Sequence, residues 1–123
     1  MIIVQGNSLE NSRVVSPYYA RNGVLAALTD ESDIIYLKTT IKEQYPVIHD
    51  VINCESRWDN SRIGEAGEIG IAQYMPKTFK WFSDISGIKG DINNPQDQIT
   101  LMVWAFQNGY AGHWTCYRIK DTY

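Results

Sequence analysis

The residues best suited to chemistry lie between Cys54 and Phe79, where one acidic side chain precedes regularly spaced glycines and a lone amide. Glu55 comes near the end of a helical pattern of apolar residues, and Gln73 follows eighteen residues later among apolar neighbours. A carboxyl group can give and take a proton, as general acid–base catalysis requires. The combination predicts a carbohydrate-cleaving site built around one acid.

The helix that carries Glu55 indicates how this carboxyl could serve as an acid. Glu55 shares a helical stripe with Ile48 and Ile52, and the neighbouring stripe consists of Val47, Val51, Cys54 and Trp58. A carboxyl at the edge of an apolar face loses hydration, which raises its pKa toward the range that a general acid needs at neutral pH. The alternative is a partly exposed glutamate paired with Arg57 or Arg62, and the spacing alone favours neither interpretation.

The second half of the stretch is marked by Gly64, Gly67 and Gly70, which recur every three residues. Glycines permit the close approach of a ligand to the backbone, although an ordinary loop would explain them as well. Gln73 lies in an apolar run, where an amide is costly unless it has a hydrogen-bond partner. Pro76 suits the first position of a following helix. These features favour a binding loop that leads into a helix.

This pattern of residues resembles the soluble lytic transglycosylase (SLT) domain, a lysozyme-like family related to goose-type lysozyme. The family pattern is Glu-Ser followed by Gly-x-x-Gly-x-x-Gln-x-Met-Pro-x-Thr. The matching residues here are Glu55, Ser56, Gly67, Gly70, Gln73, Met75, Pro76 and Thr78. The clear resemblance covers Tyr45 to Pro95, and a looser match extends to Cys116. The N-terminal part of the chain takes no part in it.

The chain departs from the family pattern at three places. The family often has a serine nine residues after the acid, where this chain has Gly64. Most members carry a later Ala-Tyr-Asn helix whose tyrosine approaches the acid, and this chain has no such sequence. The ending Trp114-Thr115-Cys116 instead resembles a shorter branch, which pairs a cysteine before the catalytic glutamate with one near the end. The acid is therefore expected to be shared, and the details around it to differ.

The two cysteines allow three interpretations, of which a disulfide between Cys54 and Cys116 is preferred because the shorter branch has such a pair. A bridge of this span would stabilise the fold by about 4 kcal/mol in the chain-entropy model. Two buried free thiols, the usual state in a cytosolic protein, are the second interpretation. A zinc site that also uses His49 and His113 is the third. It is disfavoured because His49 and Cys54, five residues apart on a helix, point in different directions.

The resemblance implies a substrate and a mechanism. The substrate would be the β-1,4 bond between N-acetylmuramic acid (MurNAc) and N-acetylglucosamine (GlcNAc) in peptidoglycan. Glu55 would protonate the departing oxygen, while the acetamido group of the sugar stabilises the anomeric carbon. Glu55 would then accept the proton of the C6 hydroxyl, giving 1,6-anhydro-MurNAc. Ser56 would orient Glu55, and Gln73, Tyr74 and Met75 would bind substrate along the floor of the cleft. No metal and no cofactor is implied.

Two other functions compete with this one. A hydrolytic lysozyme (muramidase) on the same fold would need a second carboxylate to activate water, and Glu65, Glu68 and Asp91 are the candidates. The chain could also be a non-catalytic peptidoglycan-binding module, or a structural part of a cell-wall or phage machine. The presence of the Glu55-Ser56 pair argues against a site without catalysis.

Composition narrows the class of protein. The 123 residues suffice for one domain with a modest core, and 44% of them are hydrophobic and 12% aromatic. A net charge of −3 without a basic block disfavours nucleic acid as a partner. No apolar run has the length of a membrane span, and no signal peptide is visible after Met1. We expect a monomer that binds peptidoglycan glycan strands in the cell envelope or outside the cell, exported or delivered by a phage.

The expected architecture is mainly α, in the α+β lysozyme-like sense, with a glycine-bearing loop or small hairpin forming a sugar-binding cleft. Residues 1–32 are predicted to be an N-terminal arm of uncertain structure, with a helix over Tyr18–Leu28 capped by Ser16-Pro17, and residues 33–123 the lysozyme-like domain. Further helices are expected over 34–45, 46–58, 76–85 and 95–108. The last of these should be capped by Asn94, end at Gly109 and bury its wide apolar face against the Glu55 helix.

Overall fold

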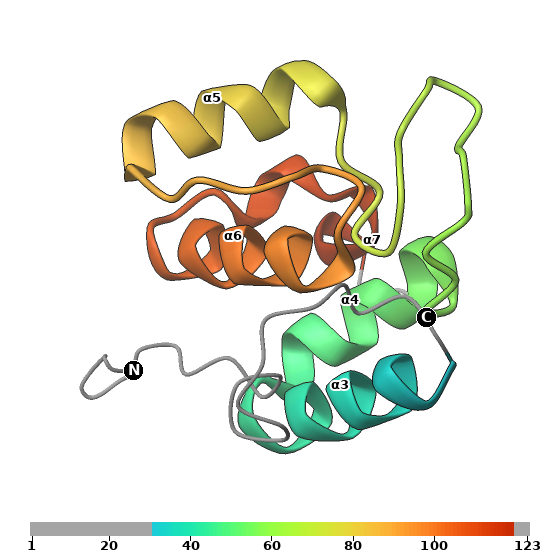
Figure 1. Cartoon of the computed structure of the whole chain (residues 1–123). Helices are drawn as coiled ribbons and strands as arrows, with labels where there is room; N and C mark the ends of the chain where they lie inside the picture. Colours follow the sequence, from blue (N-terminus) through green and yellow to red (C-terminus); the bar gives the residue numbers. More distant parts are fainter. Residues whose placement is uncertain (1–30, 120–123) are drawn as a thin grey trace. The chain divides into compact units, whose positions relative to one another are not determined.

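The computed structural model describes residues 31–119, which are mainly helical (Figure 1). The elements are α3 (Glu31–Gln44), α4 (Pro46–Ser56), α5 (Pro76–Ser86), α6 (Pro95–Gln107), a 3₁₀ turn η1 (Ala111–His113) and α7 (Thr115–Arg118). The chain divides into two units after Thr40, within α3, and the site lies wholly in the second. The mainly α fold is confirmed. Residues 1–30, with most of the N-terminal arm and the helix predicted over Tyr18–Leu28, lie outside the described residues.

Helix α4 begins at Pro46, as predicted, because proline suits the first helical position. It ends at Ser56, two residues before the predicted end at Trp58. Arg57 adopts the left-handed conformation, with φ of 54°, and its N–H binds the carbonyl of Asn53 at 3.1 Å. This terminal turn places Glu55 in the last turn of the helix.

The buried face of α4 differs from the predicted pair of stripes. The helix buries Ile48, Val51, Ile52 and Ser56. In the stripe of Val47, Val51, Cys54 and Trp58, Val51 and Trp58 are buried, whereas Val47 is 46% exposed and Cys54 is also exposed. Both stripes are apolar in sequence, and the packing of the rest of the domain decides which members of each are buried.

The segment between α4 and α5 forms a long loop with a small hairpin-like turn (Figure 1). Isolated bridges join Ile63 to Ile69 and Ile69 to Tyr74, and the backbone groups of Ile69 and Tyr74 exchange hydrogen bonds of 2.9 and 3.0 Å. Among the described residues these bridges are the only β-structure. The loop or small hairpin expected from the glycines is therefore present, without full strands.

Helix α6 fastens this loop through the fully buried side chain of Gln98. Its Oε1 accepts the N–H of Ala72 at 2.8 Å, and its Nε2 donates to the carbonyls of Ile69 at 2.9 Å and Ile92 at 2.6 Å. Gly70 must be a glycine here, because its φ is +83° and a Cβ atom would lie 2.6 Å from Nε2 of Gln98. One amide thus fixes the loop that carries Gln73.

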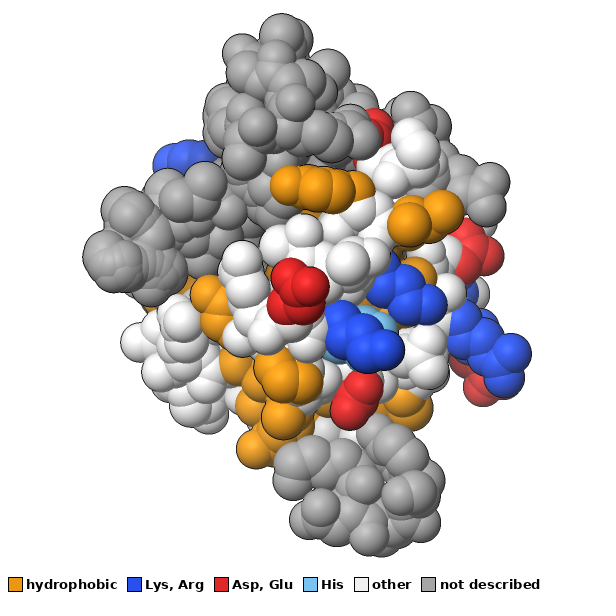
Figure 2. Space-filling model, turned by 90° about the horizontal axis from the view of Figure 1, so that it is seen from below, with side chains coloured by type: hydrophobic (Ala, Val, Ile, Leu, Met, Phe, Trp, Pro, Cys, Tyr) orange, Lys and Arg blue, Asp and Glu red, His pale blue; other side chains and the backbone are white. Residues whose placement is uncertain are grey.

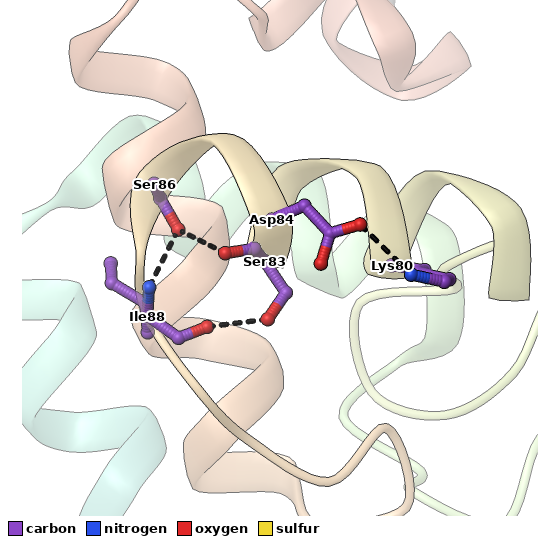
Figure 3. Close-up of polar contacts among 5 residues, drawn as sticks. All are labelled: Lys80, Ser83, Asp84, Ser86 and Ile88. Carbon is purple, nitrogen blue, oxygen red and sulfur yellow. Dashed lines mark hydrogen bonds and ion pairs between the residues drawn. The ribbon is translucent and has the colours of Figure 1, made fainter.

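Helices α5 and α6 pack against each other. Phe79 and Phe82 of α5 are buried, as predicted. Hydrogen bonds among Ser83, Ser86 and Ile88 secure the C-terminal end of α5, and Lys80 pairs with Asp84 at 2.9 Å (Figure 3). Helix α5 is thereby held at both its buried face and its end.

Helix α6 has the N-terminal cap predicted for it, because Oδ1 of Asn94 accepts the N–H of Asp97 at 3.0 Å. It ends at Gln107, and Gly109 follows in the left-handed conformation with φ of +88°. The main packing partner of α6 is α5, whereas the sequence analysis expected the Glu55 helix. The neighbour of an apolar face depends on the path of the intervening loop, which the helical pattern does not specify.

The C-terminal segment packs against α4 through α7, where Cys54 and Cys116 form a disulfide with Cα atoms 6.0 Å apart. The preferred interpretation of the cysteines is confirmed, and the free-thiol and zinc interpretations are wrong because both sulfur atoms are used in the bridge. Within residues 31–119, every helix is too short or too polar to cross a bilayer.

Candidate active site

A cleft of about 110 Å³ opens between the end of α4, the long loop, the start of α5 and the C-terminal segment. Its lining residues are Glu55, Glu68, Gln73, Tyr74, Met75, Thr78, His113, Trp114 and Thr115. Four of the five predicted catalytic and substrate-binding residues meet in this cleft, and Ser56 does not line it. The fold therefore brings residues of the loop, of the start of α5 and of the C-terminal segment together around Glu55.

Glu55 is half-buried, and its Oε2 accepts the backbone N–H of Cys116 at 3.2 Å. Burial raises the pKa of its carboxyl above the ordinary value of 4.5. The Cys116 N–H opposes this rise in pKa, the negative charge of Glu68 adds to it, and the charges of Arg118 and Arg62 oppose it. The desolvation expected from the helical pattern is therefore the main influence on the protonation of Glu55.

The structure does not support the alternative interpretation, in which Glu55 is paired with an arginine. Within the described residues, neither Arg57 nor Arg62 forms an ion pair with Glu55. Arg62 acts on the carboxyl only through its charge, and Arg57 lies at the exposed turn that ends α4. The Glu55 carboxyl is thus a desolvated group without a salt-bridge partner in residues 31–119.

Ser56 anchors the loop to α4. Its Oγ donates to the carbonyl of Ile71 at 2.6 Å and accepts the N–H of Trp58 at 3.1 Å. The side chain is buried. These bonds join the end of the Glu55 helix to the segment just before Gln73, so Ser56 can position the site although it does not line the cleft.

Gln73 is buried and has a left-handed backbone, with φ of 53°, which is uncommon for a residue other than glycine. Its Nε2 donates to the carbonyls of Gly70 at 2.8 Å and Arg62 at 3.1 Å. Both amide hydrogens are therefore used within the loop. The side-chain oxygen is the part of Gln73 that can accept a hydrogen bond from a ligand.

Gly64 makes room for this amide oxygen and for a second carboxylate. A Cβ atom at Gly64 would lie 2.8 Å from Oε1 of Gln73 and would overlap Oε1 of Glu68. The same Glu68 oxygen accepts the N–H of Ala66 at 2.9 Å. Gly64 is a departure from the family pattern, and its lack of a side chain leaves the space that the Glu68 carboxylate occupies in the cleft.

Tyr74 and Met75 line the cleft, as the sequence analysis expected. The ring of Tyr74 packs edge-on against Phe79 at 5.2 Å and Trp114 at 5.3 Å between ring centroids. Tyr74 is 1% exposed, and its hydroxyl has no hydrogen-bond partner in the described part of the chain. Burial raises the pKa of this hydroxyl, so it stays protonated and can act as a donor. Met75 is exposed at the rim.

The C-terminal wall of the cleft was missed from the sequence. His113, Trp114 and Thr115 contribute to it, and Nε1 of Trp114 donates to the carbonyl of Ala72 at 2.8 Å. The available signal was the pairing of Cys116 with the cysteine next to Glu55, which brings the residues before Cys116 to the acid. Nothing in the sequence indicated that Gln98 of α6 would bind the backbone of the loop.

Of the three candidates for a second carboxylate, only Glu68 lines the cleft, while Glu65 and Asp91 are exposed elsewhere on their loops. Residues 31–119 contain no cluster of three histidine, cysteine, aspartate or glutamate side chains that could hold a metal ion. On the face shown in Figure 2, described acidic and basic side chains lie close together among apolar ones. Glu55 and Glu68 are therefore the two carboxylates that line the cleft.

The comparisons with known proteins agree with this arrangement. The family model described as "Transglycosylase SLT domain" matches residues 34–115, which include every residue that lines the cleft. No curated protein and no solved structure gave a match. The chain therefore belongs to the transglycosylase SLT domain family, a family of lysozyme-like enzymes that act on peptidoglycan.

Proposed function

We propose that this chain cleaves the β-1,4 bond between MurNAc and GlcNAc in peptidoglycan, with Glu55 as general acid and then general base. The observation that carries the proposal is the half-buried Glu55 carboxyl in a cleft, with a pKa raised by burial. A raised pKa keeps a carboxyl protonated closer to neutral pH, where it can protonate a leaving group.

The first step protonates the glycosidic oxygen from Glu55 as the bond to the anomeric carbon breaks. The acetamido group of the MurNAc ring stabilises the positive charge at that carbon, so no second carboxylate is needed as a nucleophile. Glu55, now ionised, accepts the proton of the C6 hydroxyl while the C6 oxygen attacks the anomeric carbon. The products are a 1,6-anhydro-MurNAc end and a free GlcNAc hydroxyl, and water is not consumed.

The remaining residues of the cleft would bind the sugar. The side-chain oxygen of Gln73 can accept a hydrogen bond from a sugar N–H or hydroxyl, because its nitrogen is already occupied. Tyr74 is 1% exposed and its hydroxyl is buried, so it would support the floor of the cleft from beneath the sugar. The N–H of Cys116 holds the Glu55 carboxylate in place at 3.2 Å, which supports a fixed geometry for both proton transfers.

Hydrolysis is the second candidate, and the presence of Glu68 in the same cleft favours it. Glu68 could act as the general base that activates a water molecule, as in an inverting glycosidase. The product would then carry a reducing end in place of the anhydro ring. Glu65 and Asp91 do not support this mechanism, because neither lines the cleft.

The substrate class determines where the protein would act. Peptidoglycan lies in the cell envelope, so an exported or phage-delivered enzyme working there or outside the cell is part of the proposal. The disulfide between Cys54 and Cys116 supports an oxidising compartment. We further propose that the protein works as a monomer, with residues 33–123 as the lysozyme-like domain.

The test is digestion of purified cell wall followed by mass analysis of the released fragments. Anhydro ends are expected from the wild type, and reducing ends would support hydrolysis through Glu68 instead. Glu55→Gln keeps the shape of the side chain but cannot donate the proton, so cleavage should fall to a few per cent of wild type or less. Full activity of this variant, or the absence of any cleavage by the wild type, would contradict the proposal.

A further inference from the structure

Helix α5 extends one wall of the cleft outward to an exposed aromatic ring. Thr78 lines the cleft from the first turn of α5, and Trp81 lies three residues further on the same face. The ring of Trp81 is 5.5 Å from that of His113, which also lines the cleft. Trp81 is 42% exposed. A chain that leaves the cleft past Thr78 and His113 would therefore meet Trp81.

The Trp81 ring is held in a fixed orientation from several sides. Besides His113, it contacts Tyr110 at 5.5 Å and 74° and the fully buried Phe82 at 5.0 Å and 42°. Tyr110 in turn stacks on Trp104 at 5.5 Å and 20°. A ring already fixed in this way loses little conformational freedom when a ligand packs on it.

Trp81 is not part of the buried face by which α5 packs on the rest of the domain. Phe79 and Phe82 supply the buried face of this helix. The neighbouring charges of Lys80 and Asp84 are paired with each other at the surface (Figure 3). An exposed indole beside a cleft presents an apolar face together with one N–H donor. A pyranose ring has the matching surface, because its C–H groups form apolar patches edged by hydroxyl oxygens.

We propose that Trp81 is a stacking platform for a pyranose ring of the glycan strand, outside the cleft and next to His113. This inference rests on the proposed function, because the ring that stacks on Trp81 belongs to the strand whose cleaved bond lies beside Glu55. The platform gives the site a preference for long strands over short ones.

The experiment titrates the Glu55→Gln variant, which leaves the glycan intact, with β-1,4-linked GlcNAc oligomers of three and six units. In this background Trp81→Ala should weaken hexamer binding roughly 2- to 12-fold, the range that one aromatic contact supplies. Binding of the trimer should change less than binding of the hexamer, because a shorter chain has fewer rings with which to occupy both the cleft and Trp81. Trp81→Phe should keep most of the hexamer affinity, since it keeps an aromatic face. The indole N–H signal of Trp81 should shift more on addition of hexamer than on addition of trimer.

Ile85→Ala is the matched control, because Ile85 is a large apolar side chain, 48% exposed, one turn further along α5. It should leave both affinities unchanged. The platform would be overturned if Trp81→Ala lowered the affinity for trimer and hexamer equally, or left the hexamer affinity unchanged. It would also be overturned if Ile85→Ala lowered the hexamer affinity as much, or if the Glu55→Gln parent did not bind the hexamer. Cell-wall digestion by the wild type reports separately on the proposed function, so a wild type that digests walls while Trp81→Ala binds the hexamer normally rejects the platform alone.

Discussion

The mechanism proposed above requires a protonated Glu55, and this side chain is half-buried in the folded state. Because burial raises its pKa, the folded protein holds this proton more tightly than the unfolded chain does. The free energy of unfolding should therefore fall as pH rises from the ordinary value of 4.5 through the raised value. Below this window both states are protonated, and the effect is absent.

Glu55→Gln should consequently be at least as stable as the wild type at neutral pH, because glutamine cannot ionise. Its side-chain oxygen can still accept the N–H of Cys116. Urea unfolding of both proteins at acid and neutral pH measures the difference, which should shrink as the pH falls below the window. A variant that loses stability relative to wild type as pH rises would show that the Glu55 carboxylate stabilises the fold.

The second prediction concerns Glu68, whose negative charge raises the pKa of Glu55 across the cleft. Glu68→Gln removes that charge, so the pKa of Glu55 should fall and the alkaline limb of kcat/KM should move to lower pH. The groups that oppose this charge, Arg62, Arg118 and the Cys116 N–H, stay in place. The measurement is the pH profile of wall digestion.

Glu65→Gln is the matched control for Glu68, because it removes one charge from the same loop at an exposed position that does not line the cleft. Its profile should follow that of the wild type. An equal shift in both variants would mean that only the net charge of the loop matters. Loss of reducing ends in Glu68→Gln, had the wild type produced them, would instead identify Glu68 as the base of a hydrolytic reaction.

At the scale of elements, the long loop depends on helix α6 through Gln98. Gln98→Ala removes three hydrogen bonds and leaves buried backbone groups of the loop without partners. Unsatisfied buried groups cost about 1–3 kcal/mol each, so the loss of stability should reach roughly 3 kcal/mol. Thermal and urea unfolding measure it, and amide exchange at Ala72 should become faster.

Gln107→Ala, at the exposed C-terminal end of the same helix, serves as the control and should stay within about 0.5 kcal/mol of wild type. If Gln98→Ala were as stable as this control, water or a shift of the loop would be replacing the amide. Activity of the folded Gln98 variant should also fall, because the segment that Gln98 holds leads directly into Gln73.

At the scale of the whole molecule, the disulfide joins the helix of the acid to the last described helix. The double variant Cys54→Ala and Cys116→Ala should lose about 4 kcal/mol of stability in the chain-entropy model. Urea unfolding with and without a reducing agent tests this, since the reductant should destabilise the wild type and leave the double variant unchanged. Alkylatable thiols in the unreduced, denatured wild type would contradict the bridge.

The sequence by itself determined the features that depend on neighbouring residues. Pro46, Pro76 and Pro95 begin their helices, and Asn94 caps the last of these, because prolines and capping side chains act within one turn. The position of Glu55 among apolar residues likewise indicated the direction of its pKa shift, which burial produces. The cysteine pairing was implied by the resemblance to the shorter branch, and the structure contains it.

The tertiary structure alone decided which distant groups meet. In the folded protein Ile48 and Ser56 of α4 are buried, whereas Val47 and Cys54 are exposed. The tertiary structure also brought Glu68 into the cleft and left Glu65 exposed.

The tertiary structure likewise determines the contacts of Gln98 and the wall of the cleft formed by Trp114 and Thr115. Each of these contacts closes a long loop of chain, and the route of that loop follows from packing of the entire domain. Local patterns carry no record of that packing. Glu55, Gln73, Tyr74 and Met75 could therefore be singled out from the sequence, whereas the contact of Glu55 with the Cys116 N–H and the wall formed by Trp114 and Thr115 could not.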